Sequence, residues 1–189
     1  SVVGTTSVTS SGSVTLTDGT NDFDTDDSGD AVTVSGTSVS LTDTDALALD
    51  ITSSTGDSTV VAGSTLSLTA GSVAGNLLVT TDGAITQTGG VSVTGTTTID
   101  ADSDDDANNA VTLTNAANNF TGAVAVDDGA AIQITDADAL VLGSINGDSL
   151  TLSTDGDISQ TSDGLVISGL TTIDADSDDD RPIPPPQLR

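Results

Sequence analysis

Hydrophobic and small polar residues alternate along this chain in many short runs. Examples are VTLT at 14–17, VTVSG at 32–36 and LSLT at 66–69. Alternation with period two, in runs rich in β-branched residues, is the pattern of a strand with one buried and one exposed face. Asp-Gly pairs such as Asp18-Gly19 stand between the runs and predict turns. No segment has the composition of a helix, so the sequence predicts an all-β protein.

Longer sequences recur as well. TTIDADSDDD stands at 97–106 and again at 171–180, and TDGAITQT at 81–88 matches TDGDISQT at 154–161. Two imperfect repeats, about 14–106 and 111–180, therefore make up most of the chain. The first repeat carries a segment at about 50–70 that has no counterpart in the second.

The extra segment 50–70 has the form of one more strand-and-turn unit, which suggests that ~20 residues make one structural rung. Stacked rungs share a core that a single rung cannot form alone. The sequence therefore predicts a parallel β-solenoid over 1–180, with about nine rungs of ~20 residues. A β-sandwich of short strands is the alternative interpretation. The end of the chain, 181–189, is rich in Pro and is expected to be an extended tail.

The run GNLLVTTDGAITQTGGVSVTGTTTIDA, with VTLTNAANNFTGAVAV after it, resembles the repeats of large secreted bacterial surface proteins. It is similar to filamentous-haemagglutinin and autotransporter-type passenger domains and to giant adhesins built of β-strand repeats. The resemblance covers most of 14–180. It implies a right-handed parallel β-helix, export to the bacterial cell surface, and a role as a stalk or adhesive fibre. It transfers no catalytic residues, and the dense aspartates and the end RPIPPPQLR depart from the family pattern.

The charge of the chain excludes several classes of partner. Its 29 acidic residues are all Asp and face only two cations, Arg181 and Arg189, which gives a net charge of −27. We expect no nucleic-acid partner, because nothing neutralises phosphates. We also expect no membrane insertion, because no apolar run is long enough. Since Ser1 stands inside the repeat pattern without a leader, we expect a processed protein or a fragment.

The residue types that are missing narrow the chemistry. Without Cys or His, the chain has no disulfides and no imidazole or thiolate metal sites. Lys and Tyr are also absent, and the acidic clusters recur at repeated positions, so we expect no enzyme. Cations bound by oxygen ligands remain open.

Aspartates at alternating positions form a candidate metal site. Alternate side chains of an extended strand lie on one face, and calcium takes 6–8 oxygen ligands, often from a D-x-D-x-D rhythm. Calcium is therefore the candidate cofactor. Solvated acidic loops, which keep a rod soluble and hinder edge pairing, are the alternative interpretation, and both remain open. The candidate ligands are Asp100, Asp102, Asp104, Asp106, Asp174, Asp176, Asp178, Asp180, Asp22, Asp24 and Asp26.

Phe23 and Phe120, the only aromatic residues, occupy matching positions in the two repeats and are expected to fill the core at a corner of a rung.

The function that we expect is a structural rod or stalk segment of a secreted bacterial surface adhesin or extracellular fibre. Its partners would be flanking repeats of a longer chain or neighbouring copies of itself, together with an unidentified host or surface receptor. The alternative is a self-assembling subunit of an extracellular filament, biofilm matrix or surface layer, whose open ends stack head to tail.

Overall fold

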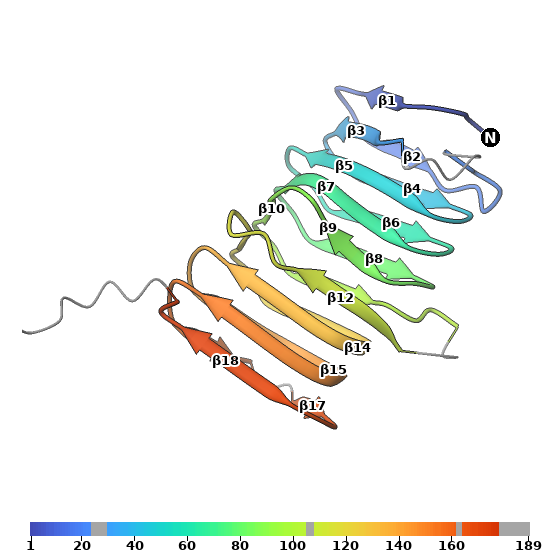
Figure 1. Cartoon of the computed structure of the whole chain (residues 1–189). Helices are drawn as coiled ribbons and strands as arrows, with labels where there is room; N and C mark the ends of the chain where they lie inside the picture. The colour runs from blue at the N-terminus through green and yellow to red at the C-terminus, as the bar shows by residue number, and fades with distance from the viewer. Residues whose placement is uncertain (24–29, 105–107, 162–163, 178–189) are drawn as a thin grey trace, which may run out of the picture.

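The computed structural model describes residues 1–23, 30–104, 108–161 and 164–177. Within these ranges the chain forms 18 strands and no helix, and all strand pairings are parallel. The same ranges hold no helix that is long and apolar enough to cross a membrane. Figure 1 shows the strands stacked in chain order, with β1 at one end and β18 at the other.

Two long ladders of paired strands run from end to end of the stack. The first contains β1 (Thr6–Thr9), β3 (Val32–Gly36), β5 (Leu47–Ser53), β7 (Leu66–Val73), β9 (Ile85–Gln87), β12 (Asn109–Leu113), β14 (Val124–Asp136), β15 (Leu140–Thr154) and β18 (Thr171–Ala175). The second contains β2 (Val14–Leu16), β4 (Val39–Asp43), β6 (Ser58–Ala62), β8 (Leu77–Thr81), β11 (Thr97–Asp100), β14, β15 and β16 (Ile158–Gln160). The long strands β14 and β15 belong to both ladders. Three short strands remain, β10 (Val91–Val93), β13 (Asn119–Phe120) and β17 (Leu165–Ile167). β10 pairs with β7 and with β13, and β17 pairs with β15.

The number of turns follows from one column of register partners. The column passes through Val14, Val39, Ser58, Leu77, Thr97, Val124, Leu142 and Gln160. It takes seven steps from rung to rung, so the solenoid has about seven turns and the expected nine is too many. The steps that contain the acidic segments, from Val14 to Val39 and from Thr97 to Val124, are the longest. The described residues before Val14 and after Gln160 add no complete turn to this column.

The extra segment of the first repeat makes one full circuit, as its length predicts. Asp50 and Ala70 are register partners in the pairing of β5 with β7. The parallel pairing confirms the solenoid and excludes the sandwich, whose neighbouring strands run antiparallel. The right-handed winding stays a prediction.

A single hydrophobic core runs through the stack, because the inward residues of each strand meet those of the next rung. In β3, for example, Val32 and Val34 are fully buried while Thr33 between them is exposed. Full burial of such a side chain stabilises the fold by roughly 1.5–3 kcal/mol. Phe23 and Phe120 are buried in the same core, which confirms their predicted role.

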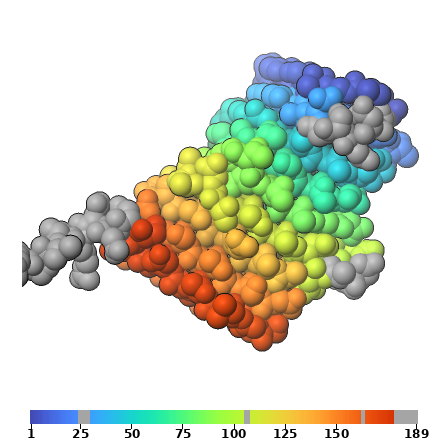
Figure 2. Space-filling model, viewed as in Figure 1, coloured from blue at the N-terminus to red at the C-terminus, as the bar shows by residue number. Residues whose placement is uncertain are grey.

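Each turn contacts mainly the turns before and after it, as the successive bands of colour in Figure 2 show. Stability in such a stack is approximately a sum of rung and neighbour terms. The described strands end at Ala175. The Pro-rich segment 181–189 lies outside the described residues, so the predicted division into solenoid and tail stays a prediction.

Candidate cation-binding corner

The candidate site lies at a corner where two successive rungs leave the second ladder. In one rung β8 ends at Thr81, and the Thr81 hydroxyl closes the turn by donating to the Gly83 carbonyl at 2.8 Å. A Cβ on Gly83 would lie 2.9 Å from the carbonyl carbon of Ser64 in the preceding rung, so a side chain there requires a backbone shift. In the next rung, residues 101–104 follow the end of β11 at Asp100.

Hydrogen bonds fix the second rung over the first at this corner. The Ser103 amide donates to the Thr81 carbonyl at 3.0 Å. The Ser103 hydroxyl donates to Asp82 Oδ1 at 3.1 Å. Asp100 Oδ1 accepts the Asp102 amide at 3.3 Å and so shapes the turn. These contacts place Asp102 and Asp104 beside Asp82.

Asp82, Asp102 and Asp104 form the acidic corner. One carboxylate oxygen from each lies within 4.8 Å of the others. Asp102 is only 3% exposed, whereas Asp82 and Asp104 are exposed. Like charges this close repel unless a proton or a cation lies among them. Three carboxylates can supply a hard cation such as calcium with a large part of its 6–8 oxygen ligands.

The second repeat repeats the hydrogen bonds of this corner. The Thr154 hydroxyl donates to the Gly156 carbonyl at 2.6 Å, and the Ser177 amide donates to the Thr154 carbonyl at 2.9 Å. The Ser177 hydroxyl donates to Asp155 Oδ1 at 2.6 Å, as Ser103 does to Asp82. Asp176 stands in the place of Asp102 but is exposed. The hydrogen-bonded turn is therefore a property of the repeat, whereas Asp178, the counterpart of Asp104, lies outside the described residues.

The structure brings together two of the predicted ligands, Asp102 and Asp104, with Asp82. Asp100 is not in this group, and its register partners are Thr80 and Asp127.

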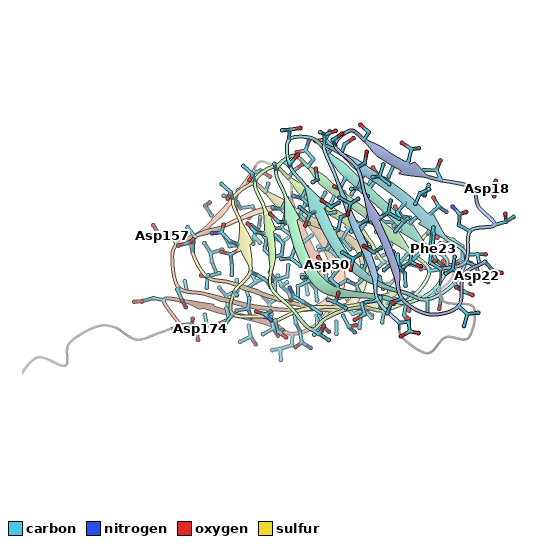
Figure 3. All side chains as sticks on the ribbon, turned by 90° about the horizontal axis from the view of Figure 1, so that it is seen from above. Asp18, Asp22, Phe23, Asp50, Asp157 and Asp174 are labelled. Carbon is cyan, nitrogen blue, oxygen red and sulfur yellow. The ribbon has the colours of Figure 1, made fainter. Side chains whose placement is uncertain are left out.

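The remaining predicted ligands lie elsewhere or outside the described residues. Asp174 is exposed on β18, at the opposite end of the solenoid from Asp22, and the two lie well apart in Figure 3. Asp176 has a positive φ of 77°, and its amide donates to the Thr154 carbonyl at 2.8 Å. Asp24, Asp26, Asp106, Asp178 and Asp180 lie outside the described residues.

Asp82 is not among the sequence-predicted ligands. Alternation within one strand points to neighbours two residues apart, whereas this group forms between rungs. The rung length is the signal that could have found it, because Asp82 precedes Asp102 by one rung of 20 residues.

Two buried aspartates have a structural role away from the acidic corner. Asp136 Oδ2 accepts the Phe120 amide at 2.7 Å, and its Oδ1 accepts the Asp138 amide at 2.9 Å. Asp43 does the same for the amides of Phe23, at 3.0 Å, and Asp45, at 3.1 Å. Burial raises the pKa of the Asp136 carboxyl, and the two amide hydrogen bonds oppose this shift. These carboxyls hold the phenylalanine corners.

Asn118 joins three rungs at the second of these corners. It is fully buried, and its Oδ1 accepts the Val91 amide at 2.9 Å and the side-chain amide of Gln87. Its Nδ2 donates to the carbonyls of Leu113 and Thr135, both at 3.1 Å. Burying these backbone groups without partners would cost about 1–3 kcal/mol each.

One family model matches most of the chain. It is described as repeats of unknown function (DUF5649) and matches residues 1–28, 55–127 and 129–180. No curated protein matches the chain. No solved structure matches it either.

Proposed function

This chain belongs to the DUF5649 family of repeats of unknown function, and we propose that it is a structural rod segment of a secreted bacterial surface adhesin or extracellular fibre. The observation that carries the proposal is the pair of parallel ladders, which run the length of the solenoid over one continuous core. Backbone hydrogen bonds along the axis resist bending and extension. A rod of this kind holds a binding domain away from a surface.

The sequence similarity to filamentous-haemagglutinin and autotransporter-type passenger domains supports the finer part of the proposal. Those proteins are exported β-helices, so we place this chain at the bacterial cell surface or in the extracellular space. Its proposed neighbours are flanking repeats or further copies, and its host or surface receptor remains to be identified. The proposal assigns no catalytic activity to the chain, because its acidic sequences recur in the two repeats and the same Ser–Asp hydrogen bond forms at equivalent places.

Single-molecule force spectroscopy tests the rod. We would hold the chain between handles at its two ends and stretch it. A stack of rungs should lengthen in steps, each releasing ~20 residues, or roughly 70 Å of extended chain at about 3.5 Å per residue. One low-force transition that releases the whole chain would contradict a load-bearing rod.

Surface labelling of intact cells with an antibody against the chain tests the location, and labelling only after cell lysis would contradict it.

We further propose that calcium binds at the acidic corner and clamps successive rungs together. Asp82 comes from one rung and Asp102 and Asp104 from the next, so an ion among them would join the two. Binding to the folded state alone at one hundred times Kd would add about 2.7 kcal/mol. At ~2–4 °C per kcal/mol for a chain of this size, Tm would rise by about 5–10 °C.

Calorimetry with and without a chelator, at matched ionic strength, tests the clamp. Asp82→Asn should abolish most of the calcium-dependent rise in Tm. Asp148→Asn removes one charge at an exposed position outside the group and should leave the rise unchanged. Equal Tm values with calcium and with chelator would show that the acidic corner is only solvated.

A further inference from the structure

The pairing of β14 with β15 is irregular at two points that lie only a few residues apart. Residues 143–144 of β15 lie together opposite Ala125 of β14, and residues 127–128 of β14 lie together opposite Asn146 of β15. Each is a β-bulge, and the second restores the register that the first shifts. Asp128 in the second bulge has a positive φ of 56°. Bulges bend a strand and re-aim its side chains, and they are common beside functional sites.

The first bulge lies where the two repeats differ. LTDTDALAL at 41–49 matches ITDADALVL at 134–142, and GSVAGN at 71–76 matches GSINGD at 143–148. The first repeat has its extra turn between the two segments, whereas the second repeat joins them directly. The extra residue of the bulge falls at this join, so the surface around it is particular to the second repeat.

A hollow of about 160 Å³, the bulge hollow, opens beside the first bulge. Ile99 and Val126 in its lining are buried. Small residues leave this space, because a Cβ on Gly143 would lie only 3.2 Å from the Cβ of Ala125. The lining is predominantly apolar and comes from three successive rungs, with Thr98 and Ile99 of β11, Ala125, Val126 and Asp127 of β14, and Ser144 of β15.

Asp127 is the charged residue in the lining of the bulge hollow, and it is exposed. The Asn146 side-chain amide donates to Asp127 Oδ1 at 3.0 Å and orients the carboxylate. A carboxylate has about four acceptor positions, so Asp127 can accept further donors. Asp100, its register partner on β11, adds a second negative charge on the neighbouring strand. The hollow therefore attracts cations and repels anions, as does the net charge of −27.

The size and the apolar lining decide which cation fits. At ~30 Å³ per water the hollow has room for roughly five waters, about the size of a four-carbon chain with an amino group. Calcium takes 6–8 oxygen ligands, whereas the lining offers one carboxylate. An aliphatic ammonium ion instead lays its chain on an apolar surface and presents three N–H donors to polar groups at the rim.

We propose that the bulge hollow binds an aliphatic primary ammonium ion, such as one end of a diamine or the side chain of a lysine. The alkyl chain lies against Ala125 and Val126, and the ammonium group donates to the Asp127 carboxylate and the Ser144 hydroxyl. No Lys stands among the 189 residues, so none of them competes for the hollow. The inference goes beyond the proposed rod function and does not rest on it, because it assigns a binding site to the side of the solenoid.

Nuclear magnetic resonance titration of the full chain with n-butylammonium chloride tests the site. The amide resonances of Ala125, Asp127 and Ser144 should shift and saturate, with a Kd in the millimolar range. n-Butanol carries a chain of the same length without the charge, and it should bind at least about fivefold more weakly, because charge-assisted hydrogen bonds are the stronger ones. The absence of saturable shifts with butylammonium would overturn the proposal, and so would equal affinities for butylammonium and butanol.

Two charge variants supply the first matched comparison. Asp127→Asn keeps the shape of the side chain and should weaken butylammonium binding at least about fivefold. Asp50→Asn removes one charge from β5, in the other ladder, and should leave the Kd unchanged. Equal Kd values in the two variants would show that the cation does not meet Asp127.

Two size variants supply the second comparison. Ala125→Leu fills the hollow and should abolish the shift at Ser144. Thr59→Leu adds the same side chain in the same register column, three rungs away, and should leave binding intact. Unchanged binding in a folded Ala125→Leu variant would place the ligand elsewhere. If Ala125→Leu fails to fold, the comparison at Asp127 decides.

Two larger ligands distinguish the sources of the ammonium group. Tighter binding of 1,4-diaminobutane identifies a free diamine as the ligand, and tighter binding of Nα-acetyl-lysine methylamide identifies a lysine side chain of another protein. A chain that binds neither, yet unfolds in rung-sized steps under force, would reject the bulge hollow as a site and leave the rod function standing.

Discussion

Removing residues 51–70 takes one complete turn out of the solenoid. Asp50 and Ala70 are register partners, so the deletion joins Asp50 to Gly71, which then occupies the position of Ile51. β4 then meets β8, because both pair with the deleted β6. The first ladder closes in the same way, and both ladders stay in register.

The size of the effect follows from what the turn contains. It holds five core residues, Ile51, Val60, Ala62, Leu66 and Leu68. A segment of this length contributes about 1–3 kcal/mol to net stability at roughly 0.05–0.15 kcal/mol per residue. Tm should fall by about 2–12 °C at ~2–4 °C per kcal/mol. The rod should shorten by about 4.8 Å, one strand spacing.

Circular dichroism and small-angle X-ray scattering measure the two effects. Deleting residues 51–60 is the control, because it removes only half a turn. The residues that follow the deletion would then shift by half a turn, and strands of the second ladder would lie over strands of the first. We expect cooperative unfolding and an unchanged β signal from the full-turn variant and a loss of both from the half-turn variant. If the two variants behaved alike, folded or unfolded, the rung assignment would be refuted.

Three further predictions concern single residues. Phe120→Ala should lower the free energy of unfolding by about 3–5 kcal/mol in urea titrations, since Phe120 is 1% exposed, and a loss below 1 kcal/mol would contradict its core role. Burial raises the pKa of Asp136 above its ordinary value of 3.8, so protonation of this carboxyl favours folding. This contribution to stability is full below pH 3.8 and is lost as pH rises through the pKa of the folded state. Tm should therefore fall from acid to neutral pH less steeply in Asp136→Asn than in the wild type, and equal slopes would argue against the shift. Gly89→Ala places a Cβ 1.9 Å from the Thr69 carbonyl oxygen and should lower Tm, whereas Gly164→Ala meets nothing within 4 Å and should not.

The sequence predicts much of the fold because the hydrophobic pattern and the rung length act locally. Alternation such as VTVSG gives both the strand and its buried face. The one-turn length of 50–70 follows from comparing the two repeats. The number of turns is less accessible, because the acidic segments lengthen some rungs and an average rung length hides this.

The acidic corner was only partly predictable, since its residues come from different rungs. Asp102 and Asp104 stand out in their aspartate run, but Asp82 belongs to an ordinary Asp-Gly turn. Asp43 and Asp136 each stand two residues before another Asp, the same spacing as in the predicted ligands, yet each accepts backbone amides at a buried corner. Only the stacking of rungs separates these two uses of aspartate.

Pulsed electron paramagnetic resonance distances along one column test the stacked parallel coil most directly. The chain has no Cys, so pairs of introduced Cys can carry spin labels. Thr15, Ser40, Thr59, Leu78, Thr98 and Ala125 are successive register partners. The distance from a label at position 15 should be about 14 Å to a label at position 78, about 19 Å to one at position 98 and about 24 Å to one at position 125. Each further rung adds one strand spacing. Distances that do not rise by equal steps in this order would contradict the coil.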